Sequence, residues 1–443
     1  MALLLAACPS TDDAGADGTT SGSTGAEPTT GSPISTSTAP ATTDDGTTTT
    51  SPPATDTSAD STGDGPCTSH DDCTDPDLPG CSTAGECVGC GQVTDPTAAC
   101  LSRNDGFDTC VDNRCVECTA DDDSACEGTT PACDLTLGEC VPCTRHDQCG
   151  ASGCNLDAGT CLPTDNVWHV GPGLCPGFGS VTSPFCDIQD AIAAVGVANE
   201  GTIWVSAGNT YQESLGIAGG QTIAIIGEDA TPPRVQPPNN GQPTLHVQGA
   251  STTVYLENFE LRGNNSSPGV HVDAATFVAQ RCRIAQNRGG LTASNGAVVA
   301  IENSFVNGDN DQGPAVDNET STVSVVYSTL LQTANFGGNP VISCGNAIST
   351  SVRNSLVVNY TNVSGPEIEC AGILVENTAE ETTTTPDLWF AAYNVGDLHL
   401  TTEGADHFAD IGVWQNGDPY IDVDNEPRVA VDGAMEHAGA DVP

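Results

Sequence analysis

The sequence contains no lysine, and its ten basic residues, all arginine, stand against 59 acidic residues in a chain of 443. The formal net charge at pH 7 is therefore −49. Nucleic acids and anionic lipid surfaces bind lysine and arginine that replace their counterions, so this charge excludes nucleic acid as a partner. Divalent cations and basic partners are compatible with it.

Large apolar side chains are almost absent from residues 9–66, which are built from Thr, Ser, Asp, Gly, Pro and Ala. Ile34 is the only large apolar residue there, and the segment has no aromatic and no basic side chain. Such a composition buries too little apolar surface to offset the entropy of ordering the chain. We expect residues 9–66 to be a disordered tether that spaces the following domains from an anchor.

The first eight residues are apolar up to a cysteine, Met1-Ala-Leu-Leu-Leu-Ala-Ala-Cys8, and the chain turns polar directly afterwards. Leu5-Ala6-Ala7-Cys8 resembles the lipobox of bacterial lipoproteins. The resemblance implies that Cys8 carries the lipid and that the protein is exported and held on a membrane by its N-terminal lipid, at the outer membrane or cell surface. Signal peptides have a basic region and roughly 7–15 apolar residues, so we expect translation to start upstream of Met1.

Sixteen cysteines fall between residues 67 and 161, in four units of four. Unit ends repeat, as in Gly85-Glu-Cys-Val-Gly-Cys90 and Gly138-Glu-Cys-Val-Pro-Cys143, which indicates a tandem array. Four cysteines a unit favour two disulfides each, and the pairing stays open. The candidates are Cys67, Cys73, Cys81 and Cys87; Cys90, Cys100, Cys110 and Cys115; Cys118, Cys126, Cys133 and Cys140; Cys143, Cys149, Cys154 and Cys161.

Zinc is the alternative interpretation of this array, because three Cys-x-x-Cys pairs occur and His70 and His146 lie nearby. The pairs straddle unit boundaries, whereas a structural zinc site needs two pairs together. We therefore favour disulfides and exposed loop histidines. The array resembles the cysteine-rich repeats of secreted myxobacterial-type proteins, which implies a stalk or interaction module.

From residue 166 the chain becomes rich in β-branched residues. Residues 183–195 contain Ile188, Ala191, Ile192 and Val195 at helical spacing, which predicts a short amphipathic helix. The strand-like runs that follow, with Tyr211-Gln-Glu213 at a turn, resemble the start of the pectate-lyase-like right-handed β-helix family. In that family the helix closes the N-terminal end of the coil.

Five equivalent tetrapeptides begin at residues 258, 281, 303, 327 and 354, with spacings of 23, 22, 24 and 27 residues. This period is typical of one solenoid coil. Their second and fourth residues should face inward and their third outward, with Asn favouring the turn. We predict an all-β fold for residues 166–443, a right-handed parallel β-helix, with a multi-domain β-sandwich as the alternative.

Five cysteines fall inside this domain. Cys282 takes the inward position that Ser304, Ser328 and Ser355 take in other coils, so we expect a buried free thiol. The remaining cysteines are expected to pair as Cys175–Cys186 and Cys344–Cys370.

The end of the chain, Asp422-Val-Asp424-Asn-Glu-Pro-Arg428 followed by Gly439-Ala-Asp441, resembles the closing signature Asp-x-Asp-Gly-x-Pro-Arg … Gly-Ala-x-Glu of bacterial surface β-helix proteins. Asn425 replaces the usual Gly, and the final Glu is missing. The resemblance implies a cap over the last coil in which Arg428 pairs with one of the acids. A metal site at Asp422 and Asp424 is the alternative.

Catalytic motifs of the polysaccharide-cleaving β-helices are missing, including Gly-His-Gly and Arg-Ile-Lys. The best acidic cluster is Asp309 and Asp311, with Asp273 and Asp317 placed on adjacent coils and Arg281, Arg283 and Arg288 one coil before it. Asp309, Asp311 and Asp317 are candidate Ca²⁺ ligands, although Asp and Asn are also common in solvated turns.

Two functions remain. We favour a non-catalytic surface lipoprotein that binds a glycan or surface protein, or acts as a spacer, and needs no cofactor. The alternative is a tethered polysaccharide lyase or glycoside hydrolase with a Ca²⁺-dependent acidic groove.

Overall fold

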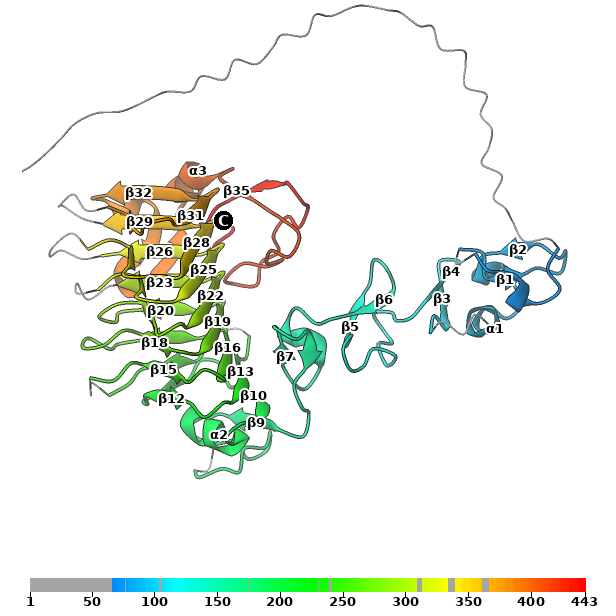
Figure 1. The fold of residues 1–443 in the computed structure, drawn as a ribbon, viewed down its shortest axis with the longest axis horizontal. Coiled ribbons are helices and arrows are strands. Elements are labelled where there is room, and N and C mark those ends of the chain that lie inside the picture. Colours follow the sequence, from blue (N-terminus) through cyan, green and yellow to red (C-terminus); the bar gives the residue numbers. More distant parts are fainter. Residues whose placement is uncertain are drawn as a thin grey trace, which may run out of the picture. The chain divides into compact units, whose positions relative to one another are not determined.

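The computed structural model describes residues 66–443 apart from residues 76, 103–105, 174, 230, 239–240, 309–312, 334–338 and 361–365. Cys8 and residues 9–65 of the predicted tether therefore lie outside the described residues. Figure 1 shows a coil of stacked strands, preceded by a chain of small cysteine-rich units. Within the described ranges, no helix has the length and apolar character needed to cross a membrane.

Residues 200–383 form a parallel β-helix of about seven turns, which confirms the predicted fold class. Three parallel sheets make its sides. The first sheet contains β9 (Val167–Val170), β10 (Glu200–Val205), β13 (Thr222–Gly227), β16 (Thr253–Glu257), β19 (Thr276–Gln280), β22 (Val298–Glu302), β25 (Thr322–Val326), β28 (Ser349–Arg353) and β31 (Leu374–Glu376).

The other two sides have the same stacking, each strand pairing with the strand one coil away. The second sheet contains β11 (Thr210–Tyr211), β14 (Arg234–Val235), β17 (Glu260–Arg262), β20 (Arg283–Ala285), β23 (Phe305–Gly308), β26 (Thr329–Gln332), β29 (Leu356–Tyr360) and β32 (Ala379–Thr383). The third contains β12 (Leu215–Ile217), β15 (Leu245–Gln248), β18 (Val270–Asp273), β21 (Leu291–Ser294), β24 (Val316–Asn318), β27 (Ile342–Cys344) and β30 (Ile368–Glu369).

The corner between the first and second sheets is made by one left-handed residue in each of six coils. These residues have φ between 44° and 57°, a region in which Asn is tolerated better than most residues. Five of them are the first residues of the tetrapeptides identified in the sequence, Asn258, Arg281, Asn303, Tyr327 and Asn354, and the sixth is Asn377.

Inside the coil, alternate residues of each strand make one continuous apolar core. Phe259 and Leu261 are fully buried on either side of the half-buried Glu260, as the predicted alternation requires. A polar ladder runs beside them at the corner. The amides of Cys282, Ser304 and Ser328 donate to the hydroxyls of Ser304, Ser328 and Ser355 respectively, at 3.0–3.2 Å.

The N-terminal end of this core is covered by α2 (Ile188–Val195), in which the four residues at the predicted helical spacing are buried. Glu213 fixes the start of the helix, because its two carboxylate oxygens accept hydrogen bonds from the amides of Ile188 and Gln189 at 2.8 and 3.0 Å. A carboxylate at this position also interacts favourably with the helix dipole.

Each cysteine-rich unit pairs its first cysteine with its third and its second with its fourth. The eight disulfides are Cys67–Cys81, Cys73–Cys87, Cys90–Cys110, Cys100–Cys115, Cys118–Cys133, Cys126–Cys140, Cys143–Cys154 and Cys149–Cys161. Cys175–Cys186 and Cys344–Cys370, the two pairs expected above, are also bonded, and Cys282 is a buried free thiol.

Secondary structure inside the units is short. The helical turns are η1 (His70–Asp72), η2 (Cys90–Gln92), α1 (Pro96–Leu101) and η3 (His146–Cys149). The hairpins are β1 (Gly80–Cys81) with β2 (Cys87–Val88), β3 (Thr109–Val111) with β4 (Arg114–Val116), β5 (Ala132–Asp134) with β6 (Glu139–Val141), and β7 (Cys154–Asn155) with β8 (Thr160–Cys161).

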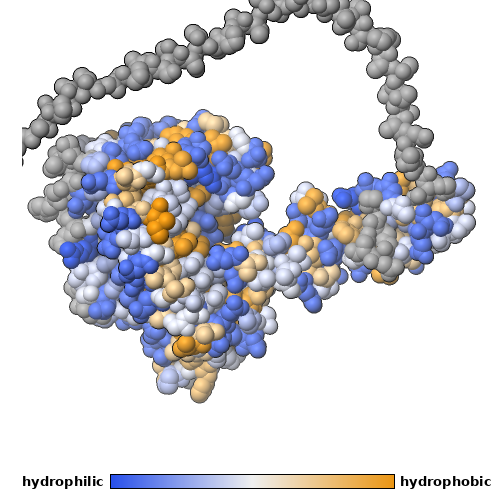
Figure 2. Space-filling model, in the orientation of Figure 1, coloured by the Kyte–Doolittle hydropathy of each residue, from blue (hydrophilic) through white to orange (hydrophobic). Residues whose placement is uncertain are grey.

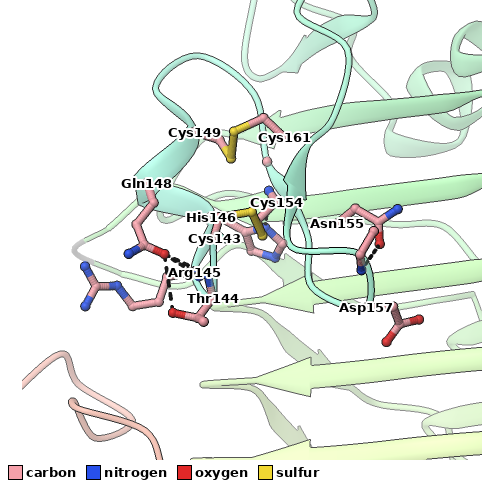
Figure 3. Close-up of a disulfide and its surroundings, with 12 residues drawn as sticks. Cys143, Thr144, Arg145, His146, Gln148, Cys149, Cys154, Asn155, Asp157 and Cys161 are labelled. Carbon is pink, nitrogen blue, oxygen red and sulfur yellow. Dashed lines mark hydrogen bonds between the residues drawn. A yellow bond between two sulfur atoms is a disulfide. The ribbon is translucent and has the colours of Figure 1, made fainter. Parts of the chain in front are cut away.

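The fourth unit, held by the two disulfides in Figure 3, packs on the outer face of the first sheet. Leu162 is buried there against Ala224, Ile226 and Tyr255. The Tyr255 hydroxyl of the sheet donates to Asn155 Oδ1 of the unit at 2.8 Å. Two more hydrogen bonds join the unit and the sheet: the amide of Gly153 donates to Thr202 Oγ1, and Trp204 Nε1 donates to Ala151 O. The unit therefore covers outward apolar residues that the coil would otherwise expose.

Residues after β32 leave the coil and cover the outer face of the second sheet. They contain η4 (Pro386–Leu388), β33 (Phe390–Ala392), η5 (Tyr393–Val395), β34 (Asp397–Leu400), α3 (Thr402–Phe408), β35 (Gly412–Val413) and β36 (Met435–Glu436). Phe305, Leu331 and Leu356 of the sheet are buried against Phe390, Leu398 and Val423 among others. We call residues 384–443 the C-terminal segment.

The predicted cap over the last coil is wrong. Residues 422–441 lie along the side of the coil, where the amides of Gly439 and Ala440 donate to Asn354 O and Thr329 Oγ1. Outward apolar residues such as Phe305 require cover along the second sheet, which explains this placement. Arg428 pairs with Glu436, at 3.8 Å, and not with an aspartate of the motif.

Candidate functional site

A cleft of about 360 Å³ lies where the fourth cysteine-rich unit, the first sheet and the C-terminal segment meet. Strand ends β16, β19 and β22 supply Glu257, Gln280 and Glu302, which stack in register on three successive coils. The other described lining residues are Thr144, Arg145, Asp147, Asp229, Arg281, Asn303, Gly417, Asp418, Pro419, Tyr420, Ile421 and Asn425.

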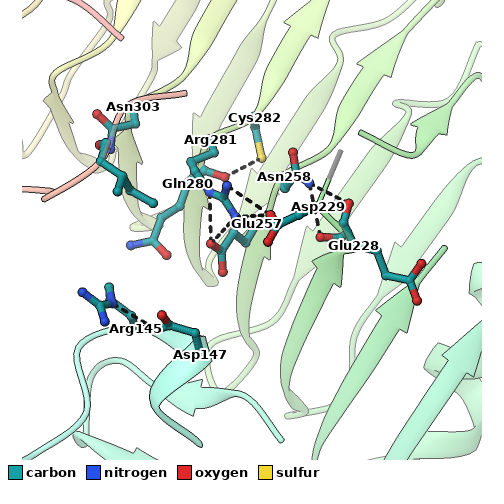
Figure 4. A network of polar contacts seen from close by, with 12 residues as sticks. Arg145, Asp147, Glu228, Asp229, Glu257, Asn258, Gln280, Arg281, Cys282 and Asn303 are labelled. Carbon is teal, nitrogen blue, oxygen red and sulfur yellow. Dashed lines mark hydrogen bonds and ion pairs between the residues drawn. The ribbon is translucent and has the colours of Figure 1, made fainter. Parts of the chain in front are cut away.

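Arg281 organises one wall of the cleft, as Figure 4 shows. Its guanidinium is 2.8 Å from Glu257 Oε1 and 3.3 Å from Asp229 Oδ1, and only 10% of the side chain is exposed. Burial lowers the pKa of a guanidinium, but the two carboxylates outweigh burial and raise it. One ion-pair network therefore joins Arg281 to both Glu257 and Asp229.

A second ion pair lies at the cleft, between the first sheet and the C-terminal segment. Arg353 of β28 contacts both carboxylate oxygens of Asp418, with Nη1 to Oδ2 at 2.7 Å, and Asp418 is almost fully buried. Asp418 also accepts from the amide of Gln415 and the side chain of Asn354. On the unit's side, Arg145 pairs with Asp147 at 3.0 Å.

Glu302 is the only carboxylate among the described lining residues that has no arginine partner. It accepts a hydrogen bond from Gln280 Nε2 at 2.8 Å. Burial raises its pKa above the ordinary value of 4.5, while the Gln280 hydrogen bond lowers it. Glu302 therefore keeps its proton to a higher pH than an exposed glutamate does.

Neutral polar groups and one aromatic ring complete the lining. Tyr420 is 44% exposed, its ring packs at a tilt of 47° against Trp414 with centroids 5.6 Å apart, and the Arg145 guanidinium lies 5.9 Å from its centroid. Figure 2 shows hydrophilic and apolar residues interspersed over the face in view. The arrangement offers hydrogen-bond donors, acceptors and a ring face, the groups that bind polar ligands.

The acidic cluster expected from the sequence lies only partly within the described residues. Asp309 and Asp311 lie outside the described residues. Asp317 lies in the third sheet, where its register partner Thr292 pairs in turn with His271, so Asp273 is two coils away and not on an adjacent coil. Burial raises the pKa of Asp317, an environment that disfavours an ionised Ca²⁺ ligand without the ion.

Two of the three arginines expected beside that cluster are engaged elsewhere. Arg281 faces the cleft described above, and Arg283 of the second sheet pairs with Asp424 at 2.7 Å. Neither arginine lies in the expected groove, because the chain turns at residue 281 from the first sheet onto the second.

The two aspartates of the closing motif have separate roles. Asp422 accepts hydrogen bonds from the amides of Asp424, Glu426 and Val442 at 2.8–3.0 Å, so its oxygens already serve the backbone turn. Asp424 instead faces His399. A metal held by Asp422 together with Asp424 does not fit this arrangement.

The histidines of the first and fourth units have the same structural role. Nδ1 of His70 accepts from the amide of Cys81 at 2.8 Å, and Nδ1 of His146 from the amide of Cys154 at 2.9 Å. The expectation of an exposed loop is wrong for His146, which is 1% exposed under the packed fourth unit. With the nearby cysteines in disulfides, neither histidine has thiolates to complete a zinc site.

The cleft was not predicted from the sequence, because its walls come from residues more than 250 positions apart. The one signal in the sequence is an acidic or amide residue at the end of three consecutive first-sheet strands: Glu257, Gln280 and Glu302.

Comparison with known proteins adds little about activity. Residues 53–167 match a family of unknown function (DUF8331), which covers the cysteine-rich units and not the β-helix. No curated protein matches the chain.

Proposed function

We propose that this protein is an exported, lipid-anchored surface protein whose β-helix binds a polar ligand of the glycan type in the cleft, without cleaving it. The observation that carries the proposal is the lining, in which amides, paired charges and the face of Tyr420 surround a cavity of about 360 Å³. Sugars are bound by such planar hydrogen-bonding groups together with aromatic faces.

The use of the carboxylates supports the proposal that the ligand is bound without being cleaved. Glycoside hydrolysis needs two carboxyl groups flanking the scissile bond, one of them free to act as base or nucleophile. Among the described lining residues, Asp147, Asp229, Glu257 and Asp418 are each held by arginine. Glu302 alone supplies an acid without a partner base.

Export and anchoring rest on two features. Ten disulfides favour an oxidising compartment, because cytosolic thiols are kept reduced. The lipobox-like Leu5-Ala6-Ala7-Cys8 supplies the lipid attachment site. Mass spectrometry of the membrane fraction, from cells carrying the gene with its upstream region, should find a diacylglyceryl group on Cys8. An unmodified N-terminus would contradict the anchor.

Binding is tested by screening the oxidised chain on an array of neutral and acidic glycans. We expect neutral glycans to bind and Tyr420→Ala and Gln280→Ala to weaken binding about tenfold or more, since each removes a contact of roughly 1–2 kcal/mol. Thr276→Ala, on the same strand as Gln280 but outside the cleft, is the control.

Incubation of each bound glycan with the protein then tests the hydrolase or lyase alternative. New reducing ends or unsaturated products that disappear in Glu302→Gln would overturn the non-catalytic assignment. Binding that the two cleft variants leave unchanged would place the ligand elsewhere on the protein.

A further inference from the structure

His399, Asp424 and Asp441 converge within the C-terminal segment, and none of the three lines the cleft. Each offers one donor atom, and the three atoms all lie within 4.8 Å of one another. They come from β34, from the turn of the closing motif and from the end of the chain, so the fold brings them together from separate elements.

Each of these side chains is oriented through its other polar atom. Nδ1 of His399 is hydrogen-bonded to Asp397, Oδ1 of Asp424 accepts from Arg283 Nη2 at 2.7 Å, and Oδ2 of Asp441 accepts from the amide of Leu400 at 2.7 Å. Asp441 is 7% exposed, and its second oxygen has no hydrogen bond among the described residues. Nε2 of His399 faces Asp424 Oδ2 at 2.5 Å.

This pattern is that of a metal centre with its supporting shell. A histidine that binds a metal through one nitrogen almost always hydrogen-bonds a carboxylate or carbonyl through the other, which fixes its tautomer and orientation. Around an ion with bonds of about 2.1 Å, donor atoms are at most about 4.2 Å apart. Donors within 4.8 Å of one another reach that geometry with small side-chain adjustments.

We propose that His399, Asp424 and Asp441 bind one divalent transition-metal ion, with Asp397 and Arg283 as positioning residues. One imidazole and two carboxylates suit Zn²⁺ or Mn²⁺ better than Ca²⁺, which takes six to eight oxygen ligands. The charges agree: three aspartates and one arginine leave a net charge of −2 when the imidazole is neutral, which the ion cancels.

The ion would tie three parts of the C-terminal segment to one another and, through Arg283 and Phe305, to the second sheet. The Phe305 ring contacts His399 edge-on, with centroids 5.0 Å apart. Asn425, next to Asp424, lines the cleft. The metal would therefore stiffen one wall of the cleft, although its binding does not depend on any ligand there.

The test is calorimetric titration of the chelator-treated, oxidised full chain with Zn²⁺ and, separately, with Mn²⁺ and Ca²⁺. We expect one equivalent of Zn²⁺ or Mn²⁺ and a raised melting temperature. Asp397→Asn should weaken binding about 10–100-fold, the usual cost of losing a supporting residue. His399→Gln and Asp424→Asn should weaken it further, and His407→Gln, an exposed histidine on nearby α3, should leave it unchanged.

Substitution with Co²⁺ keeps the test decisive even where a variant fails to fold. The wild-type chain should give the visible spectrum of nitrogen and oxygen ligands without a thiolate charge-transfer band. No bound transition metal, tighter binding of Ca²⁺ than of Zn²⁺ and Mn²⁺, a thiolate band, or stoichiometric binding that survives in folded His399→Gln would each overturn the proposal. Loss of glycan binding with intact metal binding would bear only on the proposed function.

Discussion

At the scale of single residues, the corner ladder explains why a cysteine is tolerated in the middle of the coil. Sγ of Cys282 lies 3.4 Å from Leu256 O and Gln280 O, and Ser304 and Ser328 bond the equivalent carbonyls of later coils. A thiol and a hydroxyl thus make the same contacts there, although the thiol makes them more weakly.

Cys282 should be inert in the folded protein. Burial raises the pKa of its thiol to about 12, and only a thiolate reacts with alkylating reagents. Peptide mapping after iodoacetamide treatment should find Cys282 unmodified in buffer and modified in denaturant. Modification in buffer would mean that the coil opens at this corner.

The matched substitution Cys282→Ser should fold and change the free energy of unfolding by less than about 1.5 kcal/mol, the net value of one hydrogen bond. Ser328→Ala should cost about 1–3 kcal/mol, because it leaves the buried amide of Ser304 without an acceptor. Urea denaturation followed by circular dichroism measures both.

Glu302 should make stability depend on pH. Burial raises its pKa above 4.5, so the folded state binds the proton more tightly than the unfolded chain. The contribution of Glu302 to the free energy of unfolding is therefore most favourable below pH 4.5, and it is lost as the pH rises through the pKa of the folded state. Glu302→Gln should raise the free energy of unfolding by about 0.5–2 kcal/mol at pH 7, the range of one stabilising change. At pH 4 it should change the free energy of unfolding little.

The control for this substitution is Glu376→Gln, an exposed residue in the same column of the first sheet, three coils along. Melting curves at the two pH values should show no difference between Glu376→Gln and the wild type. Equal gains for Glu302→Gln at pH 4 and pH 7 would mean that burial of the charge is not the cause.

At the scale of elements, α2 shows how a short helix is held by tertiary contacts. Eight residues are too few for a stable isolated helix. Its apolar face completes the core at the open end of the coil, and Glu213, from the turn before β12, bonds its first amides. The helix and the first coil therefore depend on each other.

Removing this cap should destabilise the N-terminal end of the coil. Glu213→Ala leaves two helix amides without their acceptor, at a cost of about 0.5–2 kcal/mol. Asp190→Asn, an exposed acid in the same helix, should have a small effect. Hydrogen exchange of the α2 and β12 amides measures the difference, and equal exchange in both variants would contradict the capping role of Glu213.

At the scale of the whole molecule, two sides of the coil are covered by other parts of the chain. The fourth cysteine-rich unit covers Ala224 and Tyr255 on the first sheet, and the C-terminal segment covers Phe305 and Leu356 on the second. The cleft exists because both covers stop short of Glu257 and Glu302.

If the fourth unit is part of the folding unit of the coil, a change where the two pack together should destabilise the β-helix. Leu162→Ala should lower the free energy of unfolding by about 2–5 kcal/mol, the usual cost of a buried leucine truncated to alanine. Leu137→Ala, half-exposed in the third unit, should be near neutral. An unchanged β-helix transition in Leu162→Ala would mean that the unit unfolds independently.

The sequence by itself determined the architecture of the coil, because strand alternation, the 22–27-residue period and a tolerant corner residue are local requirements. It also determined that each cysteine unit forms two disulfides and that residues 188–195 form an amphipathic helix. These features depend on residues close together in the chain, so their patterns can be recognised without a structure.

Only the tertiary structure decided which outward faces are covered and which charges meet. The buried outward position of Phe305, the change of sheet that separates Arg281 from Arg283, and the meeting of His399 with Asp424 and Asp441 all follow from packing between distant segments. Such contacts have no period and no fixed spacing. Their energy comes from burying surfaces that are neighbours only after the coil has formed.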